Sequence, residues 1–306
     1  MLVLLLIGGC TLPVVEDDPE DHQNPERSPS RMADHSIVPV LKAGQIPESA
    51  IQKAIDTLHI GYGHTSHGSQ VTDGMAGLVV FANNGHLNNS YTTDLFVWNR
   101  GGAEGALDLY EGSGYSDGHL ELDAGYSGWD EKTRDFLDDP EYADYNTIIW
   151  SFCGQLSGWS SEELRDNYLD KMAQLEIEYP EVTFVYMTGH LDGTGESGNL
   201  HLRNEEIREY CISNNTWLFD FADIESYDPD GISYLEKYAD DGCNYDSDGD
   251  GSRDRNWAAD WQNSHIEGVE WYSCDSAHSQ ALNANMKAYA AWWLFARIAG
   301  WSDQDS

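Results

Sequence analysis

Short apolar runs alternate with segments of helical periodicity over most of the chain. The apolar runs predict buried strands at residues 57–62, 147–152, 182–187 and 216–221. The periodic segments predict helices at residues 70–82, 160–179, 199–211 and 279–299. Strands that alternate with helices indicate an α/β fold with a central parallel sheet and helices on both faces. Residues 83–141 show no clear period and are expected to form long loops over one end of the sheet.

The N-terminal residues differ from the rest of the chain. Residues 1–7 are apolar and lead through two glycines to Cys10, an order that resembles the bacterial lipobox. Residues 1–10 are therefore predicted to be a signal peptide with Cys10 as the lipidation site, and an ordinary secretory signal is the alternative. Residues 11–37 are acidic and interrupted by prolines, which predicts a disordered tether ahead of one domain over residues 38–302. The protein is expected to be exported, as a lipoprotein of the cell envelope or a secreted protein.

Charge restricts the partners of this protein. The chain has 16 Lys+Arg against 54 Asp+Glu, a formal net charge of -38. Nucleic-acid phosphates and anionic membrane surfaces repel such a polyanion, so nucleic acid is not an expected partner and the only expected membrane attachment is the lipid anchor at Cys10. Export also makes four cysteines candidates for two disulfides, with the pairing left open. These are Cys153, Cys211, Cys243 and Cys274.

Two segments far apart in the sequence carry residues suited to acyl transfer. Ser66 follows the first predicted strand in a Gly-rich turn that leads into a predicted helix, where backbone N–H groups can stabilise an oxyanion. A turn with a capping serine is the alternative. Asp275 and His278 precede the last predicted helix, and the spacing of three suggests that the carboxylate orients the imidazole. Together these residues indicate nucleophilic catalysis at the carboxyl ends of parallel strands.

On these residues the chain resembles the SGNH hydrolase superfamily, also called GDSL-like esterases, over residues 58–301. The segment His64-Thr65-Ser66-His67-Gly68 is similar to the serine block of that family, and Asp275 with His278 matches its D-x-x-H block. The resemblance implies a flavodoxin-like three-layer α/β/α fold. It also implies that Ser66 is the nucleophile, His278 the base and Asp275 the residue that orients the base, with no cofactor for catalysis.

Residues 124–129 and 148–155 are similar to the second and third blocks of the same family. The resemblance implies an oxyanion hole formed by Ser66, Gly128 and Gln155, where Gln155 replaces the usual asparagine. The expected reaction is cleavage of an ester by a serine esterase, and the favoured partner is a small ester or an acylated carbohydrate that carries O-acetyl groups. His190, Trp129 and Trp159 are expected to contact this substrate.

Two other functions remain open at this point. One is a noncatalytic, calcium-stabilised surface binding protein on an SGNH fold. The other is a metal-dependent hydrolase, although the spacing of its candidate ligands matches no known motif. Those ligands are His64, His67, His190, Asp192 and His265.

An acidic loop at residues 244–256 predicts a structural calcium ion. Oxygen-bearing side chains occupy alternate positions, and a glycine stands at the sixth position, as in the first half of an EF-hand loop. Trp257 occupies the twelfth position, where an EF-hand needs a bidentate glutamate, so a complete EF-hand is not expected. A solvated acidic turn is the alternative. The predicted ligands are Asp246, Asp248, Asp250, Ser252 and Asp254.

Overall fold

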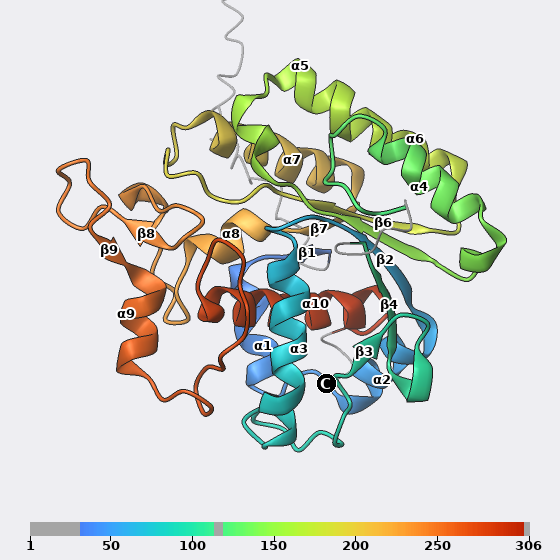
Figure 1. Ribbon diagram of the computed structural model, residues 1–306, viewed down its shortest axis with the longest axis horizontal. Coiled ribbons are helices and arrows are strands. Elements are labelled where there is room, and N and C mark those ends of the chain that lie inside the picture. Colours follow the sequence, from blue (N-terminus) through green and yellow to red (C-terminus); the bar gives the residue numbers. More distant parts are fainter. Residues whose placement is uncertain (1–30, 113–118, 303–306) are drawn as a thin grey trace, which may run out of the picture.

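The computed structural model describes residues 31–112 and 119–302 (Figure 1). At its centre lies a seven-stranded sheet in the order β1-β7-β6-β5-β2-β4-β3, with every pair of neighbours parallel. The α/β fold with a parallel sheet is therefore confirmed. The strands are β1 (Met32–Ala33), β2 (His59–Gly63), β3 (Trp98–Asn99), β4 (Leu107–Glu111), β5 (Thr147–Trp150), β6 (Thr183–Met187) and β7 (Trp217–Phe219). The four predicted strands correspond to β2, β5, β6 and β7.

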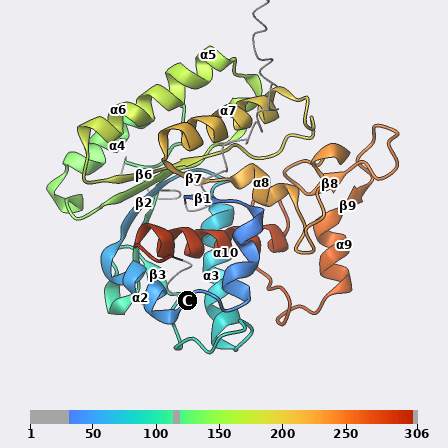
Figure 2. The ribbon, with the colours of Figure 1, turned by 180° about the vertical axis from the view of Figure 1, so that it is seen from behind.

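Helices cover both faces of the sheet (Figures 1 and 2). One face carries α1 (Val38–Lys42), α2 (Glu48–Thr57), α3 (Ser69–Asn83) and α10 (Ala281–Ile298). The other carries α4 (Trp129–Asp138), α5 (Ser161–Leu164), α6 (Asp170–Glu178) and α7 (Asn199–Asn214). The predicted capping box at Ser160 opens α5, which continues through the π-helical turn η5 (Arg165–Leu169) into α6. The four predicted helices are thus present.

Smaller elements complete the described chain. α8 (Phe221–Ser226) follows β7, and α9 (Trp257–Ser264) follows a two-stranded antiparallel ribbon of β8 (Asn244–Tyr245) and β9 (Arg255–Asn256). The 3₁₀ helices are η1 (His35–Ile37), η2 (Ala103–Gly105), η3 (Pro140–Tyr142), η4 (Gly154–Gly158) and η6 (Leu235–Lys237).

Two hydrophobic clusters lie on opposite sides of the sheet. The C-terminal helix α10 is buried around almost its whole circumference, because it packs against α1, α2 and α3 as well as the sheet. Its Trp292 is fully buried. Burying one large apolar side chain in this way stabilises the fold by roughly 1.5–3 kcal/mol.

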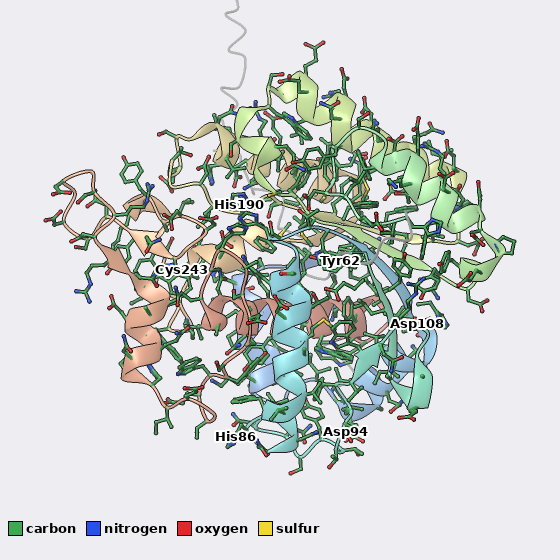
Figure 3. All side chains as sticks on the ribbon, in the orientation of Figure 1. Tyr62, His86, Asp94, Asp108, His190 and Cys243 are labelled. Atoms are coloured by element: carbon green, nitrogen blue, oxygen red, sulfur yellow. The ribbon has the colours of Figure 1, made fainter. Side chains whose placement is uncertain are left out.

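Residues 83–141 contain β3, β4 and α4, so the expectation of long loops alone was wrong. β4 carries Asp108, whose buried carboxylate accepts hydrogen bonds from the Gly101 N–H at 2.7 Å and the Tyr145 hydroxyl at 2.9 Å, and pairs with His59 at 2.8 Å (Figure 3). Burying this charge costs little free energy, because hydrogen-bond partners from outside β4 compensate for the lost water. The aspartate nevertheless interrupts the apolar run by which a buried strand is recognised in a sequence.

Two further expectations need correction. β1 lies within the segment assigned to the tether, and its Met32 and Ala33 are buried against β7, so the folded chain begins before residue 38. The four cysteines of the described chain are free thiols, and the two expected disulfides are absent from it. The signal peptide with Cys10, and the tether up to residue 30, lie outside the described residues. No helix within residues 31–112 and 119–302 combines the length and apolar character needed to cross a membrane.

The strand order locates the edge of the sheet where a ligand is expected to bind. β4 lies on one side of β2, whereas β5, β6 and β7 follow in succession on the other. The winding direction therefore reverses between β2 and β5. In doubly wound sheets, ligands bind beyond the carboxyl ends of the strands at this reversal point.

Candidate functional site

Ser66 lies at the reversal point, in the turn between β2 and α3. The turn is held locally by Ser69, whose N–H and hydroxyl both donate to the Ser66 carbonyl oxygen, at 3.2 and 2.9 Å. The Ser66 side chain is half-buried, and its hydroxyl has no hydrogen-bond partner within the described chain. The strand-to-helix turn predicted from the sequence is therefore present, with the serine hydroxyl uncommitted.

The turn that carries Asp275 and His278 reaches the same edge from the other end of the chain. The Gln70 Nε2 on α3 donates to the Ala277 carbonyl oxygen at 2.6 Å. The His278 ring stacks on the His67 ring with centroids 4.3 Å apart. His278 adopts a left-handed backbone conformation with φ of 65°, which is uncommon for a residue other than glycine and clusters at functional sites.

The predicted pairing of Asp275 with His278 is absent from the described structure. Residues 275–278 form a turn, and α10 begins only at Ala281, so the two side chains do not share a helix face. Asp275 instead lies near the carboxylate of Asp73, whose pKa is raised by burial and by the charge of Asp275. No hydrogen bond joins Ser66 to His278 either, in the part of the chain described.

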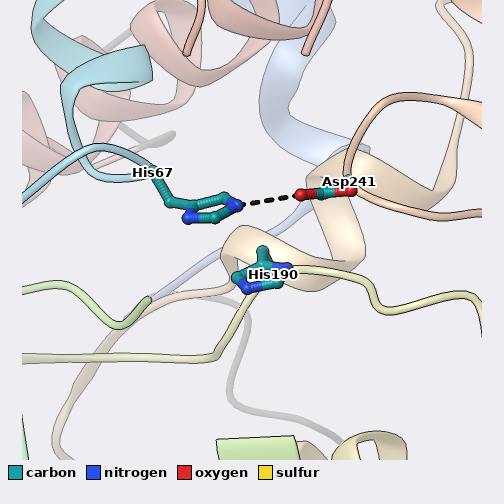
Figure 4. Close-up of side chains that lie close together, drawn as sticks. All are labelled: His67, His190 and Asp241. Atoms are coloured by element: carbon teal, nitrogen blue, oxygen red, sulfur yellow. Dashed lines mark hydrogen bonds and ion pairs between the residues drawn. The ribbon is translucent and has the colours of Figure 1, made fainter. Parts of the chain in front are cut away.

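His67 lies at the centre of a cluster of polar side chains at this edge, part of which is drawn in Figure 4. Its Nε2 lies 2.9 Å from the Asp241 Oδ2, and its Nδ1 lies 3.3 Å from the Cys153 Sγ. His190, which follows β6, stacks on the face of the His67 ring opposite to His278, with the ring centroids 3.8 Å apart. Burial lowers the pKa of His67, although the hydrogen bond to Asp241 opposes this shift. A neutral imidazole between a thiol and a carboxylate is thereby favoured.

His67, His190 and Asp241 also offer three ligand atoms within 4.8 Å of one another. The two ring planes, however, are 4° from parallel and stacked face to face. An imidazole binds a metal ion in the plane of its ring, about 2.0–2.1 Å from the nitrogen, so two stacked rings cannot direct their lone pairs at one ion. Joint coordination would require one ring to rotate, and the observed arrangement favours hydrogen bonding.

The other candidate ligands of the metal-hydrolase hypothesis make separate contacts with other residues. His64 is fully buried, and its Nε2 lies 3.2 Å from the Glu111 Oε1. Burial opposes ionisation of Glu111, but hydrogen bonds from His64 and Thr72 hold its pKa below the ordinary value. His265 stacks on Trp261, and Asp192 accepts hydrogen bonds from Thr194.

Gly128 and Gln155, two of the three predicted oxyanion donors, lie in two loops that are joined by a hydrogen bond. Gly128 precedes α4 with φ of 84°, a conformation that favours glycine. Gln155 belongs to the loop after β5, and its Nε2 donates to the Ala124 carbonyl oxygen at 2.7 Å. Its Oε1 accepts the N–H of Cys153 at 3.1 Å. One N–H of the amide is thus committed to joining the loops, which leaves the other for a substrate.

The two tryptophans expected to bind substrate have different surroundings. Trp129 is fully buried, and its indole N–H donates to the Asn167 carbonyl oxygen at 3.0 Å, so its ring belongs to the core and offers no face to a ligand. Trp159 is half-buried, and its ring lies over Gly125, where even a Cβ would come within 2.1 Å of it. Gly125 is therefore required for this close approach.

Sequence reasoning missed Asp123, although it positions the residue next to Ser66. Its buried carboxylate accepts the Thr65 N–H at 2.8 Å and the Thr65 hydroxyl at 2.5 Å. The carboxylate belongs to the loop after β4, so its role becomes visible only when β2 and β4 are known to be neighbours. Cys153 and Asp241 were missed for the same reason.

A buried ion pair lies close to the histidines. The Lys287 Nζ of α10 lies 2.6 Å from the Glu225 Oε2 of α8, and both side chains are fully buried. The Glu225 Oε1 accepts the N–H of Leu191, the residue after His190, and Lys287 also donates to Gln70. This pair therefore connects α3, α8, α10 and the loop after β6.

The acidic loop predicted to bind calcium follows β8. Asp246 Oδ1 accepts the Gly249 N–H at 2.7 Å, and its Oδ2 accepts the Gly251 N–H at 2.8 Å. Asp246, Asp248 and Asp250 bring carboxylate oxygens within 4.8 Å of one another. Oxygen donors of this kind fit calcium. Ser252 and Asp254 lie in the same loop and bond to Asp250 and Ser247.

Comparisons with models of protein families, with curated proteins and with solved structures find no match for this chain.

Proposed function

We propose that this protein is an exported serine hydrolase of the SGNH type that cleaves an ester, with O-acetyl groups on a carbohydrate as the favoured substrate class. The observation that carries the proposal is the meeting of the Ser66 turn and the His278 turn at the reversal point of the sheet. The hydrogen bond from Gln70 to the Ala277 carbonyl oxygen and the ring stack of His67 on His278 hold these turns together. The succession β4-β2-β5-β6-β7 also agrees with the flavodoxin-like order that the SGNH resemblance implies.

In this proposal Ser66 attacks the ester carbonyl, and His278 accepts the serine proton and returns it to the leaving alcohol. His278 is exposed, and its side chain must turn from His67 toward Ser66 for this transfer. Such hydrogen bonds are often loose without substrate and tighten in the Michaelis complex. Backbone N–H groups of Ser66 and Gly128, with the second N–H of Gln155, stabilise the oxyanion.

A serine-directed fluorophosphonate probe tests the proposal. Wild-type protein should be labelled at Ser66 and should hydrolyse p-nitrophenyl acetate. Ser66→Ala should lose the label and at least about 10³-fold in kcat/KM, since removal of a serine nucleophile is among the most damaging changes to such enzymes. Ser273→Ala is the matched control because its side chain is exposed and makes no hydrogen bond in the described chain.

The outcomes separate the three functions considered. Full hydrolysis by Ser66→Ala, with the label still bound, would show that another residue is the nucleophile. Absence of both label and hydrolysis in the folded wild type would favour a noncatalytic binding protein. Loss of hydrolysis on chelation, at a temperature where the protein stays folded, would favour a metal-dependent hydrolase.

A further inference from the structure

Cys153 occupies a position suited to a nucleophile. It lies three residues beyond the end of β5, the strand next to β2, where the winding of the sheet reverses. Its thiol is free and half-buried. The local chain is fixed at both ends, because the Ser151 N–H donates to the Gly63 carbonyl oxygen at 3.0 Å and the Cys153 N–H donates to Gln155 at 3.1 Å. The thiol is thus presented by a rigid strand end.

The groups around this thiol form an ordered series. His67 directs Nδ1 at the Cys153 Sγ, 3.3 Å away, and Nε2 at the Asp241 Oδ2, 2.9 Å away. If the proton of the neutral ring lies on Nε2, facing the carboxylate, the Nδ1 lone pair faces the thiol. Nucleophile, imidazole and orienting carboxylate in this order make up a catalytic triad, which is recognised by geometry and not by sequence position.

The imidazole of this series is held in place. His67 is 5% exposed, and its ring is stacked between His190 and His278 at centroid distances of 3.8 and 4.3 Å. His190 is itself fixed by a 2.8 Å contact between its Nδ1 and the Leu191 carbonyl oxygen. Burial and the stack on the buried His190 limit rotation of the His67 ring, so its two nitrogens stay directed at Cys153 and Asp241.

The other described thiols have no such base. Burial raises the pKa of Cys211, Cys243 and Cys274 to about 12 in each case. Cys243 lies against the Ser279 hydroxyl, and Cys274 lies near Asn285. A thiol in such surroundings stays protonated and is unreactive at neutral pH. Cys153 differs from these three through its contact with an imidazole that a carboxylate orients.

We infer that Cys153, His67 and Asp241 form a second catalytic site, a thiol nucleophile that accepts acyl groups from esters at this edge. The inference rests on the proposed function in that acyl esters reach the edge, but it does not depend on Ser66. His67 takes the thiol proton as sulfur attacks the carbonyl carbon. The bond to the alcohol oxygen breaks, His67 returns the proton to the alcohol, and a thioester remains. Water activated by His67 then cleaves the thioester to the carboxylic acid and regenerates the thiol.

Alkylation of the native full-length chain with limiting iodoacetamide tests the thiol. Peptide mapping, quantified for each cysteine, should show Cys153 modified at least about tenfold faster than Cys211, Cys243 or Cys274. Asp241→Asn should slow alkylation of Cys153 about tenfold, and Asp241→Glu should restore part of the rate, because Asp241 acts by positioning His67. Asp135→Asn makes the same charge change on the exposed surface of α4 and should leave the rate unaltered. Equal rates in Asp241→Asn and wild type would overturn the inference.

Acyl trapping tests the catalytic step. Ser66→Ala protein, mixed with p-nitrophenyl acetate and quenched in acid, should carry acetyl on Cys153 that neutral hydroxylamine removes. The double variant with Cys153→Ala should carry none there. Loss of hydrolysis in Ser66→Ala without acetyl on Cys153 would overturn this inference and leave the proposed function intact. Acetyl on Cys153 together with undiminished hydrolysis in Ser66→Ala would support the inference and remove Ser66 as the nucleophile.

Discussion

The two proposed nucleophiles lie at the same sheet edge, but their side chains have very different surroundings. Cys153 contacts a buried imidazole that is stacked on both faces and bonded to Asp241. Ser66 has a hydroxyl without a partner in the described chain, and the imidazole proposed as its base is exposed. Burial removes rotamers and orients a side chain before substrate arrives, whereas an exposed side chain is oriented only when substrate binds. The base next to Cys153 is therefore oriented before substrate binds, whereas the base proposed for Ser66 is oriented only by substrate.

The largest expected effect comes from breaking the ion pair of Lys287 and Glu225, which supports the loop after β6 next to His190. Lys287→Met should lower the free energy of unfolding by about 3–5 kcal/mol, because it leaves Glu225 charged, buried and unpaired. Urea denaturation measures the loss. The exposed Lys53→Met is the control and should change stability by less than about 0.5 kcal/mol.

The double variant Lys287→Met with Glu225→Gln sharpens this test. The amide of Gln retains an acceptor for the Leu191 N–H but carries no charge. Part of the lost stability should therefore return. If the double variant were no more stable than Lys287→Met, the unpaired charge would not be the source of the loss.

The next effect concerns Gln155, whose amide joins the loop after β5 to the loop after β4. Gln155→Ala should lower kcat for p-nitrophenyl acetate roughly 10²-fold with KM nearly unchanged, as expected when an oxyanion donor is lost. Gln155→Asn should give intermediate activity, because its amide is shorter. Ser157→Ala, in the same 3₁₀ helix, is the control. Full activity of Gln155→Ala in steady-state assays would show that this amide donates nothing to the transition state.

A smaller effect on stability is expected from removing the charge of Asp241. Burial opposes ionisation of Asp241, but the hydrogen bond with His67 holds its pKa below the ordinary value of 3.8. A depressed pKa in the folded state stabilises the protein above pH 4, and this stabilisation is lost as the pH falls through the folded pKa. Asp241→Asn should therefore cost about 1 kcal/mol at neutral pH, a value discounted for partial exposure.

Thermal melts from pH 7 to pH 3 check this expectation. The difference in stability between wild type and Asp241→Asn should shrink as the pH falls below 4. Asp135→Asn is the control, since this carboxylate is exposed and makes no hydrogen bond in the described chain, and it should change stability by less than about 0.5 kcal/mol. A constant gap for Asp241→Asn over the whole range would contradict the role of its charge.

The smallest effect belongs to the proposed calcium loop. Chelation should lower the melting temperature by roughly 2–4 °C, because an ion that binds only the folded state stabilises it. Arg253 in this loop pairs with Asp240, the residue before Asp241, at 3.0 Å. Asp246→Asn should abolish the shift in differential scanning calorimetry, and an unchanged shift in that variant would locate the ion elsewhere.

Local pattern was sufficient for several elements and for part of the site. β5 and β6 are apolar because both faces of a central parallel strand are buried, and the capping box of Ser160 is a contact between near neighbours. The Ser66 turn and the segment before α10 were likewise predicted, since each depends on a few consecutive residues. In contrast, β4 escaped prediction because the partners that satisfy its buried Asp108 lie in other elements.

The sequence by itself determined four strands and four helices with a clear local pattern, and the turns that carry Ser66 and His278. Only the tertiary structure decided which side chains meet. His67 is 86 residues from Cys153 and 174 residues from Asp241 in the chain, and Asp275 lies near Asp73 although His278 is its neighbour in sequence. A local pattern records whether a segment is buried, because burial depends on the residues of that segment. The partner of a polar group depends on the path of the whole chain, which no short stretch of sequence contains.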